Sequence, residues 1–126
     1  MEKGIKGTQT VVVTQELTAQ VMKSGTLSVY ATPAMVALME ETAYKSVEPY
    51  LEAGEGTVGS AMSMKHLAPS VLGATILCES ELTEVDGRKL TFHLIVKDKD
   101  VIVGEGEHVR FIIQEEKFLE KAKLRG

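Results

Sequence analysis

The chain has 126 residues and a mass of 13.7 kDa, a size that suits one folded domain, residues 1–126, with a single hydrophobic core. Hydrophobic residues make up 44% and charged residues 25%, which excludes disordered, collagen-like and low-complexity chains. The formal net charge of -4 argues against general nucleic-acid binding, because an acidic surface repels a phosphate backbone.

The N-terminal part of the chain contains one predicted strand and an irregular connector. Residues 1–7 lack the apolar stretch of a signal peptide, and no segment has the roughly 18 apolar residues of a membrane-spanning helix. We therefore expect a cytoplasmic protein with no membrane partner. Residues 8–14 are rich in β-branched side chains, which favours a first strand. The connector has no sustained period, and a short helical turn fits residues 17–22.

A long helix is predicted to start at Thr32. A threonine at the N-cap followed by proline at the first helical position is a typical helix start. The hydroxyl accepts a hydrogen bond from an unpaired backbone N–H of the first turn, and proline has no backbone N–H that needs an acceptor. Good helix formers continue from there to Pro49, which disfavours helical geometry at Glu48. Residues 33–39 are apolar on all sides, so a sheet or a second subunit should surround them.

The rest of the chain reads as four extended segments, at residues 57–67, 74–83, 89–97 and 101–113, before a charged tail at 116–125 that can be helical. Asp86-Gly87 and the charged residues 98–100 indicate reversals, which predicts a meander. A largely antiparallel sheet must then cover the helix, so the expected class is α+β. The single cysteine, Cys78, excludes an internal disulfide, and we expect neither a metal site nor a cofactor.

Two adjacent carboxylates on the predicted helix should have different surroundings. Glu40 has apolar neighbours at helical spacing, whereas Glu41 has Lys45 at i+4, the orientation of a helix ion pair. A carboxylate on an apolar stripe is desolvated, which suits general-base or nucleophilic work. Glu40 is therefore a candidate catalytic residue. The alternative is that it reaches solvent at the edge of the stripe or caps a structural network.

The strand after the helix carries a candidate proton-transfer residue. Alternation places Val58, Ser60, Met62, Met64 and His66 on one face and Thr57, Gly59 and the intervening residues on the other. If the first face covers the helix, His66 can approach a helical carboxylate of the same chain or of a second copy, and imidazole suits proton transfer near neutrality. A hydrogen-bonded core or interface histidine is the alternative.

Three further positions have both structural and functional interpretations. Capping explains Thr32, yet unpaired N–H groups at a helix start can also stabilise an anion or a developing oxyanion. His93 is interpreted as a residue of the sheet surface. His108 and Arg110 share a strand face with two glycines, which would let a backbone or ligand approach closely. Arg110 is a candidate anion contact, with a surface salt bridge as the alternative.

The chain resembles the fluoroacetyl-CoA thioesterase family of the hotdog superfamily. The resemblance covers about residues 30–118 and rests on ATPAMVALMEETA, PYLEAGEGTVGSAMSMKHLAPSVLGATI, EVDGRKLTFHLIVKD, GEGEHVRFII and EKF. It implies a hotdog fold, in which an antiparallel sheet wraps a long helix, and a homodimer or higher homo-oligomer. It also implies that Thr32, Glu40 and His66 are catalytic and that Gly59 and Arg110 contact substrate.

The resemblance implies hydrolysis of an acyl-CoA to free acid and CoA. The family's founding activity excludes non-fluorinated substrate with an aromatic lid ahead of the catalytic threonine, but Tyr30 is the only aromatic residue in residues 23–30 of this chain. We therefore expect a general short-chain acyl-CoA thioesterase. Glu40 would act as nucleophile or as the base that activates water. The alternatives are a hotdog protein that binds or senses acyl-CoA without turnover, and a hotdog acyl-CoA hydratase or dehydratase.

Overall fold

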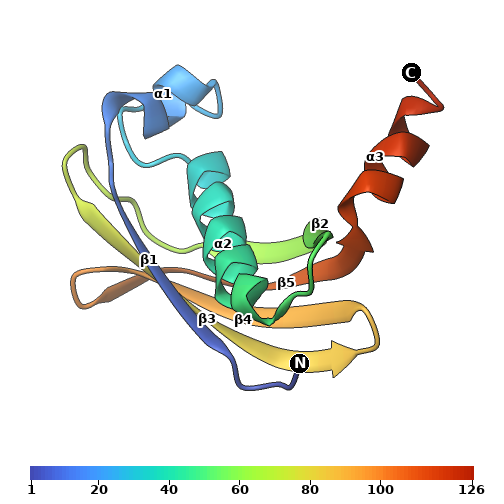
Figure 1. Cartoon of the computed structure of the whole chain (residues 1–126). Helices are drawn as coiled ribbons and strands as arrows, with labels where there is room; N and C mark the ends of the chain where they lie inside the picture. Colours follow the sequence, from blue (N-terminus) through green and yellow to red (C-terminus); the bar gives the residue numbers. More distant parts are fainter.

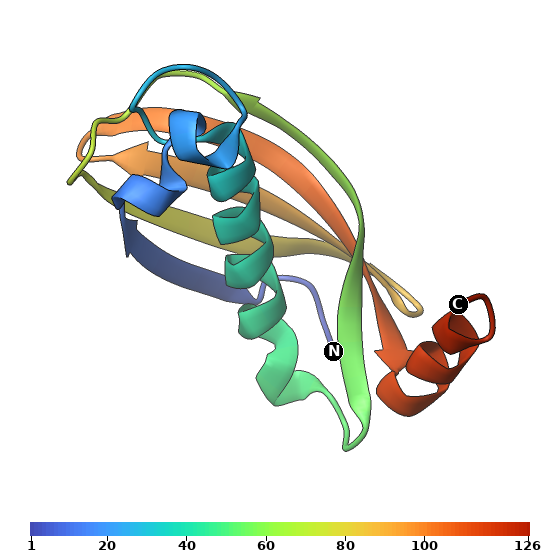
Figure 2. The ribbon, with the colours of Figure 1, turned by 90° about the horizontal axis from the view of Figure 1, so that it is seen from above.

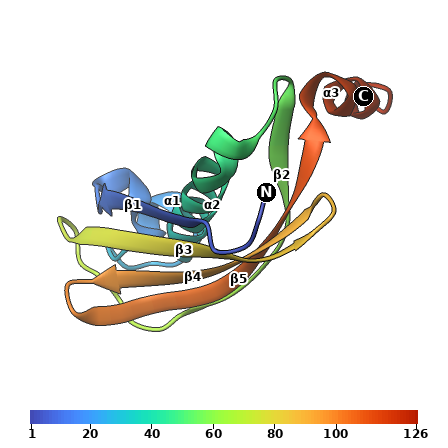
Figure 3. The same ribbon diagram turned by 60° about the horizontal axis from the view of Figure 1, so that its bottom comes forward.

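The computed structural model describes all residues of the chain, 1–126. One antiparallel sheet has the spatial order β1-β3-β4-β5-β2 and is formed by β1 (Lys6–Val12), β2 (Glu55–His66), β3 (Thr75–Asp86), β4 (Lys89–Asp98) and β5 (Val101–Gln114). The helices are α1 (Ala19–Met22), α2 (Thr32–Val47) and α3 (Glu115–Lys123), with 3-10 turns at Gln15–Leu17 and Glu48–Tyr50. The sheet curls beneath α2 (Figures 1 and 3). The predicted α+β class and order of elements are confirmed.

The start of α2 differs from the prediction by one residue. Ala31 occupies the N-cap with extended backbone angles, and Thr32 is already helical. The predicted capping role of Thr32 is wrong, because no side chain caps this helix and the Thr32 hydroxyl is hydrogen-bonded to His66 instead. The end of α2 is as predicted. The helix stops at Val47, and Pro49 lies in the 3-10 turn that follows.

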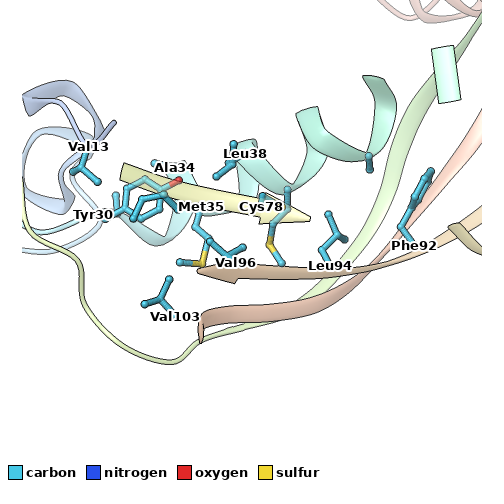
Figure 4. Close-up of a cluster of buried hydrophobic side chains, with 14 of the residues drawn as sticks. Val13, Tyr30, Ala34, Met35, Leu38, Cys78, Phe92, Leu94, Val96 and Val103 are labelled. Carbon is cyan, nitrogen blue, oxygen red and sulfur yellow. The ribbon is translucent and has the colours of Figure 1, made fainter. Parts of the chain in front are cut away.

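One side of α2 packs into the concave face of the sheet. Its buried side chains recur at helical spacing and are Ala34, Met35, Leu38, Met39, Thr42, Ala43 and Val47. They meet buried residues of β3, β4 and β5, among them Cys78, Leu94 and Val103 (Figure 4). Pro33 and Ala37 on the other side of α2 are exposed in the single chain. The sheet therefore covers only part of the apolar segment at 33–39.

The two predicted reversals are tight turns between neighbouring strands. Asp86 pairs with Lys89, and Gly87 takes a positive φ of 60° in the turn from β3 to β4. Asp98 pairs with Val101, and Lys99 has a φ of 56° in the turn from β4 to β5. The last three strands thus form the predicted meander.

The strand β2 lies at the edge of the sheet opposite β1 (Figure 2) and contains a bulge. Gly59 pairs with Arg110 of β5 but Ala61 pairs with Val109, so Ser60 is an extra residue. The predicted alternation through this strand is therefore wrong. Before the bulge Gly59 faces Glu40 of α2, whereas beyond it His66 reaches Thr32 of α2. The bulge brings both stretches of β2 to the helix side of the sheet.

The charged C-terminal segment is the helix α3, in agreement with the helical option of the prediction. It stands away from the body of the sheet beyond the end of β5 (Figures 1 and 2), and none of its residues is buried. None of the helices has the length and apolar character needed to cross a bilayer.

Candidate active site

The first residue of α2 and the last residue of β2 form a hydroxyl–imidazole pair. Thr32 Oγ1 lies 2.8 Å from His66 Nδ1. When Nδ1 carries no proton, the hydroxyl donates to it, and Nε2 then carries the ring proton. This arrangement poises the imidazole to accept the hydroxyl proton, as general-base activation of a nucleophile requires. Thr32 is exposed in the single chain, so a substrate can reach it.

The surroundings of His66 favour its neutral form. Burial lowers the pKa of the imidazole, and the neighbouring backbone of Ala68 opposes that shift in part. The Tyr30 ring meets the imidazole edge-on, with 6.3 Å between ring centroids. Nε2 of His66 is buried and has no hydrogen-bond partner in the chain. At neutral pH the ring is therefore available as a base toward Thr32.

Glu40 lies with Arg110, and no hydrogen bond or ion pair joins it to His66. Its Oε2 is 3.7 Å from Arg110 Nη1, and 43% of its side chain is exposed. The predicted desolvation of Glu40 is therefore wrong for the single chain, because the residue lies at the edge of the buried stripe. Glu40 follows Thr32 by about two helical turns, which is about 12 Å along the axis. The candidate residues thus form two groups along α2. The first group is Thr32 with His66, and the second group is Glu40 with Gly59, Arg110 and the side chains in contact with Arg110.

Arg110 is held in a fixed orientation by the strand beside it. Its Nε donates to Thr57 Oγ1 and its Nη2 donates to the Thr57 carbonyl oxygen, both at 2.9 Å. Nη1 lies 3.1 Å from Nε2 of His108, and the guanidinium stacks over the Tyr44 ring at 5.6 Å. Arg110 is 6% exposed, so the alternative of a surface salt bridge is wrong. Burial lowers the pKa of Arg110 and the Glu40 carboxylate opposes that shift, so the guanidinium remains a cation.

Gly59 leaves the space in which these groups converge. A Cβ atom at this position would lie 2.9 Å from Glu40 Oε2, 3.1 Å from His108 Cε1 and 3.2 Å from Arg110 Nη1. Those distances are shorter than ordinary carbon contacts. The absence of a side chain at Gly59 therefore lets a carboxylate, an imidazole and a guanidinium approach one point of the strand.

A cleft of about 470 Å³ opens beside this second group. Its lining includes Arg110, Tyr44 and Thr57, and its rim carries the carboxylates of Glu48, Glu52, Glu55 and Glu115. Neither Thr32 nor His66 lines it. No group of three or more His, Cys, Asp or Glu side chains is arranged to hold a metal ion.

Comparison with known proteins decides the family. A family model described as fluoroacetyl-CoA-specific thioesterase matches residues 13–116. The chain belongs to this family. A fluoroacetyl-CoA thioesterase from Streptantibioticus cattleyicolor is 40% identical over 97 residues, which cover 77% of this chain and 68% of that enzyme. Membership confirms the predicted resemblance and supports thioester hydrolysis.

Solved structures share the fold over nearly the whole length of the chain. A crystal structure of the fluoroacetyl-CoA thioesterase is 32% identical, has a TM-score of 0.94 and covers 100% of this chain and 98% of its own. A thioesterase superfamily member from Thermus thermophilus is 26% identical, with a TM-score of 0.89 and coverage of 98% and 94%. A hot-dog-like protein from Thermanaerovibrio acidaminovorans, 19% identical, has a TM-score of 0.90 and covers 99% of this chain and 93% of its own. The predicted hotdog fold is confirmed.

Three residues of the second group in this family member are missing from the predicted site. His108, Thr57 and Tyr44 all contact Arg110. The spacing of His108 and Arg110 on one strand face was a usable signal, because it places both side chains on the same side of the sheet. The contact of Thr57 with Arg110 was not accessible in that way, since it depends on the bulge at Ser60. His93 is a surface residue as predicted, 2.9 Å from Glu105.

Proposed function

We propose that this member of the fluoroacetyl-CoA-specific thioesterase family hydrolyses short-chain acyl-CoA esters to the free acid and CoA, with Thr32, Glu40 and His66 as its catalytic residues. The observation that carries the proposal is the 2.8 Å contact between the Thr32 hydroxyl and Nδ1 of His66. Related proteins support the substrate class. The fluoroacetyl-CoA thioesterase has been crystallised as variants with acetyl-CoA and with fluoroacetate and CoA.

The reaction begins at Thr32 in this proposal. His66 Nδ1 takes the hydroxyl proton as Oγ1 attacks the thioester carbonyl carbon, and the oxyanion develops beside the first turn of α2, where backbone N–H groups have no intrahelical acceptor. The C–S bond then breaks and the CoA sulfur receives the proton from His66. Water cleaves the resulting acyl ester, which releases the acid and restores the hydroxyl.

Glu40 acts in the hydrolytic half of the reaction as the base that activates water. Because Thr32 and Glu40 of one chain lie about 12 Å apart along α2, the glutamate that serves a given Thr32 would come from the second copy in the assembly. Arg110 holds the Glu40 carboxylate at the edge of the sheet, 3.7 Å from Nη1. A different order is chemically possible, in which Thr32 only binds the carbonyl group and Glu40 itself attacks as nucleophile. Mass spectrometry of enzyme quenched during turnover separates these routes, because an acyl group is expected on Thr32 in the first and on Glu40 in the second.

We infer that the working protein is a homodimer of single-domain chains spanning residues 1–126. Two features support this assembly. β2 is an edge strand with exposed residues at Gly59, Ser60 and Ala61, and edge strands pair readily with another chain. The outer side of α2 leaves Pro33 and Ala37 uncovered. Light scattering across a dilution series tests the assembly, and a monomer with full turnover at low concentration would contradict it.

The acyl specificity of this chain should extend to esters without fluorine. Tyr30, the only aromatic residue in residues 23–30, is 1% exposed and belongs to the hydrophobic core. It therefore cannot serve as a mobile aromatic lid over the acyl group. We expect acetyl, propionyl and butyryl esters to be hydrolysed alongside fluoroacetyl-CoA.

The decisive experiment measures CoA release from a series of acyl-CoA esters of increasing chain length. Turnover of the short esters by the wild type, abolished in His66→Ala with the fold intact, is the expected result. Saturable binding without thiol release would show an acyl-CoA binding or sensing protein. A product with its thioester intact and the mass of one water gained or lost would show a hydratase or dehydratase.

A further inference from the structure

His108 is the most completely buried histidine of the chain, and the proposed reaction assigns it no step. It lies on β5, is 1% exposed, and its ring packs beside Phe92 with 6.3 Å between ring centroids. Nδ1 lies 2.7 Å from the carbonyl oxygen of Ala61, and Nε2 lies 3.1 Å from Nη1 of Arg110. Both ring nitrogens therefore have partners from the surroundings of the candidate site.

These two partners define a single tautomer of His108. A carbonyl oxygen can only accept, so Nδ1 must carry the ring proton and donate it to Ala61. A guanidinium can only donate, so Nε2 must be unprotonated and accept from Arg110. The two requirements agree with each other. A second ring proton would place an N–H against the guanidinium, and burial and the Arg110 charge both lower the pKa of His108 accordingly.

The two hydrogen bonds of His108 join the bulge of β2 to the guanidinium of Arg110. The Ala61 carbonyl belongs to the residue directly after the bulge at Ser60, so His108 fixes the strand where Gly59 turns toward Glu40. The Arg110 bond orients Nη1, the same nitrogen that lies 3.7 Å from Glu40 Oε2. His108 thus connects the bulge, the guanidinium and the catalytic carboxylate in one line of contacts.

We propose that His108 is a positioning residue, whose neutral imidazole accepts from Arg110 and thereby holds the guanidinium against Glu40. This inference rests on the proposed function of Glu40. Arg110 makes two further hydrogen bonds to Thr57, one from Nε and one from Nη2, and neither involves Nη1. Nη1 has His108 as its hydrogen-bond acceptor, so loss of that acceptor leaves a buried N–H of the nitrogen that faces Glu40 without a partner, and this N–H would then compete for the Glu40 carboxylate and shift it.

Two substitutions separate the two bonds of His108. In His108→Asn the side-chain amide nitrogen is attached to Cγ, as Nδ1 of histidine is, so it can still donate to the Ala61 carbonyl oxygen. No atom of the shorter asparagine side chain reaches Arg110. In His108→Gln the amide oxygen is as many bonds from Cβ as Nε2 of histidine, so it can accept from Arg110. We expect kcat for acyl-CoA hydrolysis to fall about 10-fold or more in His108→Asn with a smaller change in KM, because a buried charged donor loses its acceptor. His108→Gln should keep kcat within about 3-fold.

Thermal unfolding of both variants shows whether each remains folded under the assay conditions. Equal loss of kcat in the two folded variants would overturn the proposal, as would full activity in His108→Asn. If either variant fails to fold, the wild type supplies the test. Long-range nitrogen–proton NMR of the ring should show Nδ1 protonated and Nε2 unprotonated at pH 7, with the guanidinium N–H signals of Arg110 protected from exchange. An Nε2-protonated ring would overturn the inference. Because this spectrum needs no substrate, it is informative even if the wild type hydrolyses no ester and the proposed function fails.

Discussion

The Thr32 hydroxyl and Nδ1 of His66 lie 2.8 Å apart, although 34 positions separate the two residues in the chain. One belongs to the first turn of α2 and the other to the last residue of β2, so the pair forms only when the helix is seated in the sheet. The hydroxyl is engaged by the imidazole and caps nothing, which separates its expected contribution to catalysis from any contribution to helix stability.

Replacement of Thr32 should therefore affect turnover far more than stability. In Thr32→Ala we expect kcat for CoA release to fall by about 100-fold or more, because proton transfer from a positioned hydroxyl is lost. Thr32→Ser keeps a hydroxyl and should retain much of the rate. The control is Thr18→Ala, since Thr18 does cap a helix by accepting from the Val21 N–H. That variant should lose about 1 kcal/mol of stability without losing turnover. A Thr32→Ala protein that is unstable yet fully active would contradict the assignment.

Two neighbouring glutamates provide a matched comparison. Glu40→Gln should reduce kcat by about 100-fold, because an amide can neither accept the proton of water nor attack as a nucleophile. Glu41→Gln removes the exposed ion pair with Lys45, 3.2 Å long, and leaves an amide oxygen that can still accept from Nε2 of Gln9. It should change stability by less than about 1 kcal/mol with kcat unaltered. CoA release and chemical denaturation of both variants provide the measurement. Equal kcat values for the two would exclude Glu40 from the reaction.

The space above Gly59 can be tested by adding one methyl group. In Gly59→Ala the new Cβ would crowd Glu40, the His108 ring and Arg110 at 2.9 to 3.2 Å. We expect kcat to fall at least about 10-fold with a loss of about 1 kcal/mol in stability, since the carboxylate can move but the buried ring cannot. Gly25→Ala is the control, because its Cβ would meet only the Ala19 Cβ at 3.4 Å. Turnover of Gly59→Ala at the wild-type rate would show that the convergence has no role in catalysis.

Stability should fall as the pH is lowered from 7 toward 5. Burial lowers the folded-state pKa of both His66 and His108 below the usual value of 6.5. The unfolded chain then binds protons at a higher pH than the folded one, so the stability present above pH 6.5 is lost as the pH falls toward the folded-state pKa values. Urea midpoints measured across this range should fall more steeply for the wild type than for His66→Gln or His108→Gln. Identical slopes in all three proteins would disprove the linkage.

Cys78 should be unreactive in the folded protein. Its side chain is fully buried, and burial raises the pKa of the thiol to about 11, so almost no thiolate exists at pH 8. A thiol reagent should label none of the native protein within minutes and one equivalent after denaturation. Rapid labelling of the native state would mean that the core opens readily around β3. An unreactive thiol also means that CoA release can be followed by thiol detection without background from the enzyme.

The order of elements could be predicted because it depends on local patterns. Pro49 ends α2 and the Asp86-Gly87 pair forms a turn for reasons contained in a few neighbouring residues. The predictions are wrong where contacts with a residue distant in the sequence decide the surroundings of a side chain. Thr32 was assigned to capping because its acceptor, His66, is brought to it only by the sheet. The surroundings of Glu40 were misjudged because helical spacing does not reveal which side of a helix the sheet leaves open.

The surroundings of Gly59 and Arg110 also depend on contacts between distant segments, here on the register of β2 with β5. Strict alternation through β2 predicts Gly59 and His66 on opposite faces, and one extra residue at Ser60 reverses that result. Nothing in the composition of β2 indicates where its register with β5 shifts. Arg110 was a candidate from its strand face, but its burial by Thr57 and His108 follows from that register.

The bulge at Ser60 sets how tolerant β2 is to changes in length. The strand has odd-numbered positions facing the helix before the bulge and even-numbered positions facing it afterwards. Deletion of Ser60 would remove the extra residue and leave six positions from Gly59 to His66, so regular alternation would keep both residues on the helix side without a bulge. Replacing Ser60 with another small residue keeps the parity intact. In variants of this protein, loss of one residue at the bulge would therefore keep Gly59 and His66 on the same face, whereas insertion of one residue would require a second bulge.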